Sequence, residues 1–307
     1  MHDFKLVRTE ESTQDSSVNF IFADSDGQYI ESRFVQRDPD KFIIYLSSQT
    51  GCTQACRFCH LTQLGLNRDV YSVNMEAFLL QTRTVLDYLR NNPDRVSGIP
   101  NKISFNFMAR GEPLCNSLVR NRSGLLFQQL SMIAAEHGYQ CQFKISTILP
   151  NNIGVRSQHI VPYYQIIESI LSGHNYDAQL YYSLYSVNPD FRKRWVPNAI
   201  SPEMAGEILY GTIDGLILHH AFIAGENDSE KDVEAILGWM SHYDIHANFN
   251  IVRYNPFSPK CGRETSDEKI HRLTVILAAD AHVDRLQVVP KVGFDVKASC
   301  GMFVSGE

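Results

Sequence analysis

Two periodicities of apolar and polar residues alternate along most of this chain. Short apolar runs typical of buried strands are followed by longer stretches in which apolar residues recur every three or four positions, as in amphipathic helices. The predicted strands are Lys41–Leu46, Ile103–Phe107, Gln142–Ser146, Gln179–Leu184, Leu216–Phe222, Ala247–Arg253 and Arg285–Val289. The predicted helices are Met75–Arg90, Gly124–His137, Gln158–Ser172, Ser201–Gly211, Ser229–Tyr243 and Asp267–Ala281. Six strand-to-helix units and a closing strand predict an α/β fold with a parallel sheet.

The first forty residues have a different pattern. Residues 1–17 are polar and unpatterned, and we expect a loose leader there. Two apolar runs, VNFIFA and YIESRF, then flank an Asp-Gly turn at residues 24–27, which predicts a β-hairpin. We therefore expect an N-terminal extension over residues 1–40 and one core over residues 41–307.

Polar and glycine-rich stretches follow the predicted strands at the points where they end. After the second strand comes Arg110-Gly111-Glu112-Pro113, and Ser299-Cys300-Gly301 follows the last. In βα barrels the carboxyl ends of the strands converge on the active site. The sequence thus predicts a TIM-like partial (β/α)6 barrel with one cleft at that end.

The segment between Ser47 and Arg68, SSQTGCTQACRFCHLTQLGLNR, carries the most specific chemistry. Cys52, Cys56 and Cys59 have the spacing C-x3-C-x2-C, and three thiolates this close can bind one soft metal centre. A [4Fe-4S] cluster needs four ligands, so one iron would remain open to the amino and carboxylate groups of S-adenosylmethionine. The alternative is a structural zinc site, which would need a fourth ligand such as His60.

Composition narrows the classes of function. The 307 residues are 44% hydrophobic, enough for a large core, and no apolar run approaches the roughly 20 residues of a membrane span. Seven cysteines and an N-terminus without a signal-peptide core predict a cytoplasmic protein with reduced thiols. The formal net charge of −6 argues against broad contact with phosphates. Arg192, Lys193 and Arg194 beside Trp195 are as consistent with a solvated helix end as with a nucleic-acid patch.

Several residues at strand ends could contact a ligand. Gly111 allows a close backbone approach, and Glu112 can accept a hydrogen bond from an ammonium group, although Gly-Glu-Pro also forms ordinary turns. Ser146 and Ser183 could bind a carboxylate or a ribose, or could simply cap turns. Asn255, fixed by the following proline, could bind an adenine edge or form an Asx turn.

Two further residues become candidates for a functional role only when all the motifs of the chain are considered together. Cys300 lies in the small, flexible context KASCGMF, which suits an exposed nucleophile, whereas an isolated cysteine is more often a buried apolar residue. Glu31 lies on the predicted hairpin, and considered by itself it would be interpreted as a solvated strand residue.

In order along the chain, seven segments resemble the landmarks of the RlmN/Cfr family, the radical SAM methyltransferases that modify adenine C2 in rRNA and tRNA. These segments are SSQTGCTQACRFC, FNFMARGEPLCN, IST, YSLYSVNPDFRKRWVPN, AFIAGENDSE, NPFSPKCGRETSDEKI and ASCGMF. The resemblance runs from about Asn19 to Phe303 and implies a radical SAM core barrel that binds a [4Fe-4S] cluster and S-adenosyl-L-methionine.

Roles follow from the resemblance position by position. Cys52, Cys56 and Cys59 match the cluster ligands, Cys300 matches the methylated cysteine, and Glu31 matches the glutamate proposed as a proton acceptor. The residues that match the SAM contacts are Gly111, Glu112, Ser146, Ser183, Leu184, Tyr185 and Asn255. The family uses one SAM to methylate its cysteine and a second to generate a 5′-deoxyadenosyl radical, and a second cysteine then releases the methylated adenine. This implies an RNA or nucleotide substrate and an electron donor such as flavodoxin or ferredoxin.

The chain also departs from the family. Tyr45 stands at the position of the family's resolving cysteine, so Cys261 or Cys115 would have to replace it or the step would differ. Tyr185 replaces a histidine, and we expect the N-terminal helical RNA-binding domain and the basic C-terminal tail to be missing. A partner protein, contacted through Trp195 and the nearby basic residues, could supply RNA affinity. The alternatives are a smaller nucleotide or metabolite substrate, non-methylating radical chemistry, or a binding protein that keeps the cluster as a structural or redox element.

Overall fold

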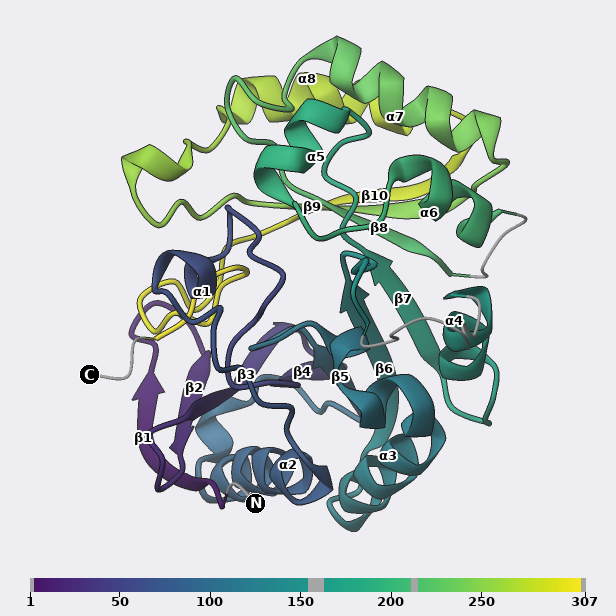
Figure 1. Ribbon diagram of the computed structural model, residues 1–307. Coiled ribbons are helices and arrows are strands. Elements are labelled where there is room, and N and C mark those ends of the chain that lie inside the picture. The colour runs from purple at the N-terminus through teal and green to yellow at the C-terminus, as the bar shows by residue number, and fades with distance from the viewer. Residues whose placement is uncertain (1–2, 154–162, 211–214, 305–307) are drawn as a thin grey trace.

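The computed structural model describes residues 3–153, 163–210 and 215–304. Within them, ten strands form a single sheet in which each strand lies next to its neighbours in sequence (Figure 1). The strands are β1 (Lys5–Glu11), β2 (Val18–Ala23), β3 (Tyr29–Asp38), β4 (Lys41–Leu46), β5 (Lys102–Phe107), β6 (Gln140–Thr147), β7 (Ala178–Tyr182), β8 (Ile217–His220), β9 (Ala247–Val252) and β10 (Val283–Val289).

The strands β1 to β4 pair in antiparallel fashion. The predicted hairpin is confirmed as β2 and β3, with the Asp24 carboxylate accepting hydrogen bonds from the backbone N–H groups of Asp26 and Gln28. The loose leader was wrong, because Lys5–Glu11 forms the edge strand β1. This strand is mostly exposed and carries charged residues, which protect a sheet edge but hide its strand character in the sequence.

The strands β4 to β10 are parallel and form the expected partial barrel. Most of the connecting helices lie on the outer side of the curved sheet (Figure 1). The six predicted helices are confirmed, with different ends, as α2 (Met75–Asn91), α3 (Ser117–Glu136), α4 (Tyr163–Leu171), α6 (Pro202–Leu209), α7 (Glu230–His242) and α8 (Asp267–Ala278). The predicted start of α4 at Gln158 and the predicted end of α6 at Gly211 lie outside the described residues.

The helices depart from the prediction in two ways, in where α3 begins and in two short helices. The helix α3 begins seven residues before the predicted Gly124, because the Asn116 side chain caps the N–H groups of Leu118 and Val119. Its backbone is kinked at Arg122, inside a polar run without helical periodicity. The short helices α1 (His60–Gln63) and α5 (Pro189–Trp195) were not predicted, since neither is long enough to show a period.

The main core lies between the outer face of the sheet and the helices. Its aromatic centre contains Phe143 of β6 and Phe127 of α3, whose rings stack with centroids 4.0 Å apart. After β10 the chain turns back and bonds to the N-terminal strands, as where Asn19 donates to the carbonyl of Val296. Residues 291–304, the C-terminal segment, thus close the gap between the two edges of the sheet beside α1 (Figure 1). The described helices include none long and apolar enough to cross a membrane.

Candidate active site

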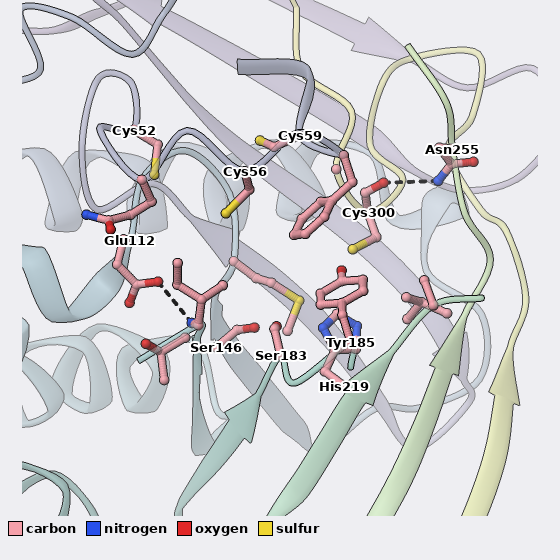
Figure 2. A pocket seen from close by; sticks show the side chains of 18 of the residues that line it. Cys52, Cys56, Cys59, Glu112, Ser146, Ser183, Tyr185, His219, Asn255 and Cys300 are labelled. Atoms are coloured by element: carbon pink, nitrogen blue, oxygen red, sulfur yellow. Dashed lines mark hydrogen bonds between the residues drawn. The ribbon is translucent and has the colours of Figure 1, made fainter. Parts of the chain in front are cut away.

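The three cysteines of the loop after β4 converge on one cavity at the carboxyl ends of the parallel strands. Cys52, Cys56 and Cys59 all line this cavity, whose volume is about 120 Å³ (Figure 2). Backbone hydrogen bonds fix the loop, since the N–H of Cys52 donates to Leu66 and the N–H of Arg57 donates to Trp195. The prediction that these cysteines share a site is therefore supported by their placement.

The donor set fits an iron–sulfur cluster better than a single zinc ion. In the described part of the chain, the group of metal-ligating side chains whose ligand atoms all lie within 4.8 Å of one another is Asp244, His246 and His282, not the three cysteines. A tetrahedral zinc ion with bonds of about 2.3 Å would draw the sulfurs closer together than that. His60, the proposed fourth zinc ligand, instead has its Nε2 atom 3.0 Å from the carbonyl oxygen of Asn255.

Burial changes the acidity of the cysteine thiols. It raises the pKa of Cys59 to about 11 and raises the pKa of Cys52 and of Cys56 well above the ordinary value, and the charges of neighbouring thiolates act in the same direction for Cys52 and Cys56. Such thiols lose their protons when a cationic metal centre binds. The loop is therefore suited to a metal centre more than to free nucleophilic thiolates.

Glu112 approaches the cysteines from the end of β5. Its carboxylate is buried and accepts hydrogen bonds from the N–H groups of Leu114 and Ile148, at 3.1 and 3.2 Å. Burial raises its pKa to about 7. A carboxylate in this setting favours an ammonium partner, because such a partner offsets the loss of hydration.

Gly111 permits this position of Glu112. Its φ is +102°, and a Cβ atom there would lie 2.6 Å from the Ser48 Oγ and 2.8 Å from the backbone nitrogen of Gln49. Only a residue without a side chain fits this space, which is the physical reason for glycine at this position.

The next two strands contribute hydroxyl and aromatic groups. Ser146 of β6 and Ser183, just after β7, both line the cavity. Tyr185 has a positive φ of 58°, and its buried ring stacks on Phe58 with centroids 4.3 Å apart. Leu184 does not line the cavity; its side chain is buried in the main core, and its carbonyl accepts a hydrogen bond from Arg192.

Asn255 joins the cavity to the C-terminal segment. Its Nδ2 atom donates to the carbonyl oxygen of Cys300 at 3.0 Å, drawn as a dashed line in Figure 2. Its Oδ1 atom is buried and has no hydrogen-bond partner among the described residues. A buried acceptor without a partner is costly, so this atom is suited to a donor on a bound molecule.

The Cys300 side chain lies in the same cavity as the cysteine triad, close to Tyr185 (Figure 2). Burial raises the pKa of its thiol, and the positive charges of Arg33 and Arg37 act in the opposite direction. Cys300 is partly exposed rather than packed as an apolar core residue. The prediction from sequence that Cys300 belongs with the cluster loop thus agrees with its place in the fold.

Glu31 has a different environment from the one its expected role requires. It is not among the residues that line the cavity, and its side chain is fully buried. The Glu31 carboxylate accepts hydrogen bonds from Arg110 at 2.7 Å, Arg33 at 3.0 Å, Asn19 at 3.2 Å and the N–H of Val304 at 3.1 Å. Burial alone would raise the pKa of Glu31, but the charges of Arg110 and Arg33 and their hydrogen bonds lower it. A carboxylate so stabilised is a weak proton acceptor.

The same two arginines hold the C-terminal segment, a function that sequence reasoning missed. Arg33 donates to the carbonyls of Ser299 and Met302, on either side of Cys300. Arg110 donates to the carbonyl of Val304 at 2.6 Å. The available signal in the sequence was that Arg110 directly precedes Gly111-Glu112 and that Arg33 lies two residues from Glu31.

The two thiols considered as substitutes for a resolving cysteine lie elsewhere. Among the described residues, the cysteines that line the cavity are the triad and Cys300. Cys115 accepts a hydrogen bond from Gln54, and Cys261 is buried near Ser258. In this conformation neither shares the cavity with Cys300.

The basic group near Trp195 has a structural role. The Trp195 ring is buried, and its Nε1 atom donates to Glu226 at 3.1 Å. Arg194 pairs with the same Glu226 at 2.9 Å, and the buried Arg192 donates to the carbonyls of Leu184 and Ile200. A solvated helix end was therefore wrong for Arg192 and Trp195, and the buried Trp195 is not available to a partner protein.

Comparison with known proteins gives both sequence relatives and a structural neighbour. No protein-family model matches the chain. A probable RNA methyltransferase of Rhodopirellula baltica is 24% identical over 316 residues, which cover 100% of this chain and 75% of that protein. The dual-specificity RNA methyltransferase RlmN of Methylorubrum extorquens is 27% identical over 91% of this chain, and this chain spans 63% of its length.

The crystal structure of a radical SAM methyltransferase from Sphaerobacter thermophilus superposes with a TM-score of 0.73. It is 22% identical and covers 97% of this chain and 80% of its own. The resemblance to the RlmN/Cfr family that the motifs indicate is thus confirmed: this chain is similar in sequence to RlmN-type RNA methyltransferases and has the fold of a radical SAM methyltransferase.

Proposed function

We propose that this protein is a radical SAM methyltransferase that uses Cys300 as a methyl carrier and methylates an adenine-containing substrate, most simply RNA. The observation that carries the proposal is that the cysteine triad and Cys300, about 240 residues apart in sequence, line one cavity. A structural or redox cluster alone would not require a fourth cysteine at that place.

Cys52, Cys56 and Cys59 would hold a [4Fe-4S] cluster, and S-adenosylmethionine would bind beside it, towards Glu112 and Asn255. Bound there, the two would supply a methyl group for transfer to sulfur and, after reduction, a 5′-deoxyadenosyl radical. Glu112 would bind the ammonium group, since among the described residues its buried carboxylate has hydrogen-bond donors but no cation beside it. Ser146 and Ser183 would bind carboxylate or ribose oxygens, and the free Oδ1 of Asn255 would accept from a nucleoside donor group.

The Cys300 thiol would release its proton to solvent, and its sulfur would displace S-adenosylhomocysteine from the methyl group of S-adenosylmethionine, forming the new S–CH3 bond as the sulfonium C–S bond breaks. Arg33 and Arg37 favour the thiolate by lowering the pKa of this thiol against the effect of burial. The stacked rings of Phe58 and Tyr185 beside it would exclude water from the reacting atoms. Glu31 would act as a positioning residue for the Cys300 segment, with the proton-acceptor role as the second candidate.

The comparisons support RNA as the substrate through the names of the relatives, and the identity of the methylated atom stays a prediction. A flavodoxin or ferredoxin as electron donor is a further prediction from the resemblance, and action in the cytoplasm is a prediction from the N-terminal sequence and the free cysteines. A second candidate function, action on a free nucleotide, is favoured by a larger cavity of about 570 Å³ beside the cysteine-lined one.

Peptide mass spectrometry on anaerobically purified, cluster-containing protein tests the carrier role. We expect a methyl group on Cys300 and none on Cys115, a free cysteine outside the cavity that serves as the internal control. The Cys300→Ala variant should retain the cluster absorption and lack the methylated peptide. Protein that cleaves S-adenosylmethionine to 5′-deoxyadenosine but never carries a methyl group on Cys300 would rule out this mechanism.

A further inference from the structure

A second and larger cavity, of about 570 Å³, lies inside the barrel next to the cysteine-lined one. The two cavities have six lining residues in common, which are Met108, His219, Val252, Arg253, Asn255 and Cys300. Cys300 therefore stands at the junction of two spaces. We call the second one the lumen chamber.

The alternation of residues along the barrel strands makes the lumen chamber polar. On β6, Gln142 and Lys144 line it, while the intervening Phe143 packs into the main core on the outer side. On β9, the amides of Asn248 and Asn250 line it together with the Phe249 ring between them. A TIM barrel interior is normally filled by layers of packed branched side chains. A hollow interior lined by amides and charges is instead suited to a polar ligand.

The lumen chamber is also strongly cationic. Its lining contains one carboxylate, that of Asp38, and six cationic side chains, which are Arg37, Lys41, Lys144, Arg253, Arg285 and Lys291. Carboxylates pair with three of the six: Lys41 with Asp38, Arg253 with Glu264 and Asp267, and Lys291 with Glu264. Within the described residues, Arg37, Lys144 and Arg285 have no ion pair. In a protein of net charge −6, this concentration of positive charge is local and selects anions.

Lys144 is a cation of the lumen chamber that has no ion pair among the described residues. Its Nζ atom lies 5.3 Å from the centre of the Tyr181 ring, and it is partly buried in the barrel. Burial, with the nearby charge of Lys41, lowers its pKa to about 8. A buried cation without a counter-ion is destabilising, so the site favours a ligand that brings a negative charge.

We propose that the lumen chamber binds a phosphate-bearing nucleoside of mononucleotide size, with its phosphate against Lys144 and Arg37 and its base towards Cys300. The volume falls in the range of about 300–1,000 Å³ that small-molecule sites occupy. Along β6, Lys144 lies two residues, roughly 7 Å, from Ser146 at the cysteine-lined end. The orientation of the base rests on the proposed function, whereas the presence of an anion site does not.

Binding of AMP to the cluster-containing protein, measured by isothermal titration calorimetry with saturating S-adenosylmethionine, tests this proposal. Saturation with S-adenosylmethionine prevents AMP from reporting on the neighbouring cavity. We expect AMP to bind at least about tenfold more tightly than adenosine, as a charge-assisted phosphate contact gives. Equal affinity for AMP and adenosine would overturn the proposal.

Two substitutions locate the site. Lys144→Met should weaken AMP binding about tenfold or more, and Lys231→Met should leave it unchanged, because the exposed Lys231 lies on α7 outside the lumen chamber. Since Lys144→Met could disturb the barrel, Arg37→Gln at an exposed position of β3 provides a second test, and it should also weaken AMP binding. Unchanged AMP affinity in both variants would show that the nucleotide binds elsewhere.

Two further measurements distinguish RNA from a free nucleotide as the source of the ligand. They also distinguish failure of the lumen-chamber proposal from failure of the proposed function. An oligoribonucleotide that displaces AMP supports the lumen chamber with RNA as the source of the nucleotide, and one that fails to displace AMP supports it with a free nucleotide. A methylated Cys300 in protein that does not bind AMP overturns the lumen chamber and leaves the proposed function intact. AMP binding that depends on Lys144, in protein whose Cys300 is never methylated, would support the lumen chamber and overturn the proposed function.

Discussion

At the scale of single residues, Gly111 sets the position of Glu112 by lacking a side chain. The backbone passes within contact distance of Ser48 and Gln49, with a φ of +102°. This close approach brings the buried Glu112 carboxylate to the cysteine-lined cavity. Both the space and the backbone conformation at this position require glycine.

The Gly111→Ala substitution should therefore destabilise the protein and displace Glu112. The strained backbone and the overlap with Gln49 should together cost about 2–5 kcal/mol in the free energy of unfolding, measured by denaturant titration. Gly27→Ala is the matched control, because Gly27 also has a positive φ but has open space around it, and it should cost about 1–2 kcal/mol. Equal losses in the two variants would mean that the close contact with Gln49 does not contribute to the free energy of unfolding.

Lys144 should give anion binding a characteristic pH dependence. Its pKa near 8 means that it is charged below that pH and progressively neutral above it, so the affinity for AMP should fall as the pH rises from 7 to 9. The groups that act on this titration are Lys41, Arg37, Lys102, Asp177 and Tyr181. Calorimetry across this range should show the fall in the unmodified protein and a flat profile in Lys144→Met. A flat profile in both would mean that Lys144 does not pair with the phosphate.

At the scale of elements, the C-terminal segment is held in place by β3 and by the turn after β5. Glu31 of β3 binds Arg33 and Arg110, and these two arginines bind the backbone on both sides of Cys300. The position of Cys300 therefore depends on a buried ion network whose members are far from it in sequence. Removing one member leaves buried charges without partners, which costs far more than the loss of an exposed pair.

The Glu31→Gln substitution should loosen the C-terminal segment. We expect a loss of about 3–5 kcal/mol in the free energy of unfolding and faster hydrogen exchange over residues 296–304. Glu10→Gln on β1 is the control, since Glu10 forms an exposed pair with Arg8 worth about 0–1 kcal/mol. If Glu31 were only a proton acceptor, its substitution would abolish activity and leave exchange in the segment unchanged.

The same network predicts how stability depends on acid. The pKa of Glu31 is lowered in the folded state, so its stabilisation is complete above the ordinary glutamate pKa of about 4.3 and is lost as the pH falls through the folded value. Unfolding free energies measured between pH 7 and pH 3 should therefore decline less steeply in Glu31→Gln.

At the scale of the whole molecule, charge is distributed unevenly. The chain has a net charge of −6, while the lumen chamber collects six cationic side chains against one carboxylate. If RNA binds through the lumen chamber, its phosphates meet the cations of that chamber rather than a wide basic surface. The attraction is concentrated inside the barrel.

Binding of single-stranded RNA should accordingly have a shallow salt dependence. The lumen chamber has three cations without an ion pair among the described residues. If RNA binds through these three, at a slope of about −0.7 per phosphate contact, a plot of log affinity against log salt should have a slope near −2. Fluorescence anisotropy with a labelled oligonucleotide across a salt series would measure it. A slope of about −5 or steeper would indicate a wide basic surface and would contradict this charge distribution.

The sequence predicted the strands and most helices well where the period was long enough to read. The strand Lys41–Leu46 has the predicted bounds, and the three cysteines share the predicted cavity. The prediction failed for β1, whose charged edge position lacks an apolar pattern, and for α5, which spans two turns. It also failed for Leu184, since a motif match cannot say which way a side chain points.

The sequence by itself determined the order of strands and helices, the cysteine spacing and the resemblance to a family, because these depend on local periodicity and on fixed spacings. Only the tertiary structure decided that Glu31 is paired with two arginines and that the barrel interior is hollow and cationic. These properties arise from contacts between segments up to about 270 residues apart. Such contacts are set by how the sheet curves and how the chain ends return to it, which no local pattern encodes.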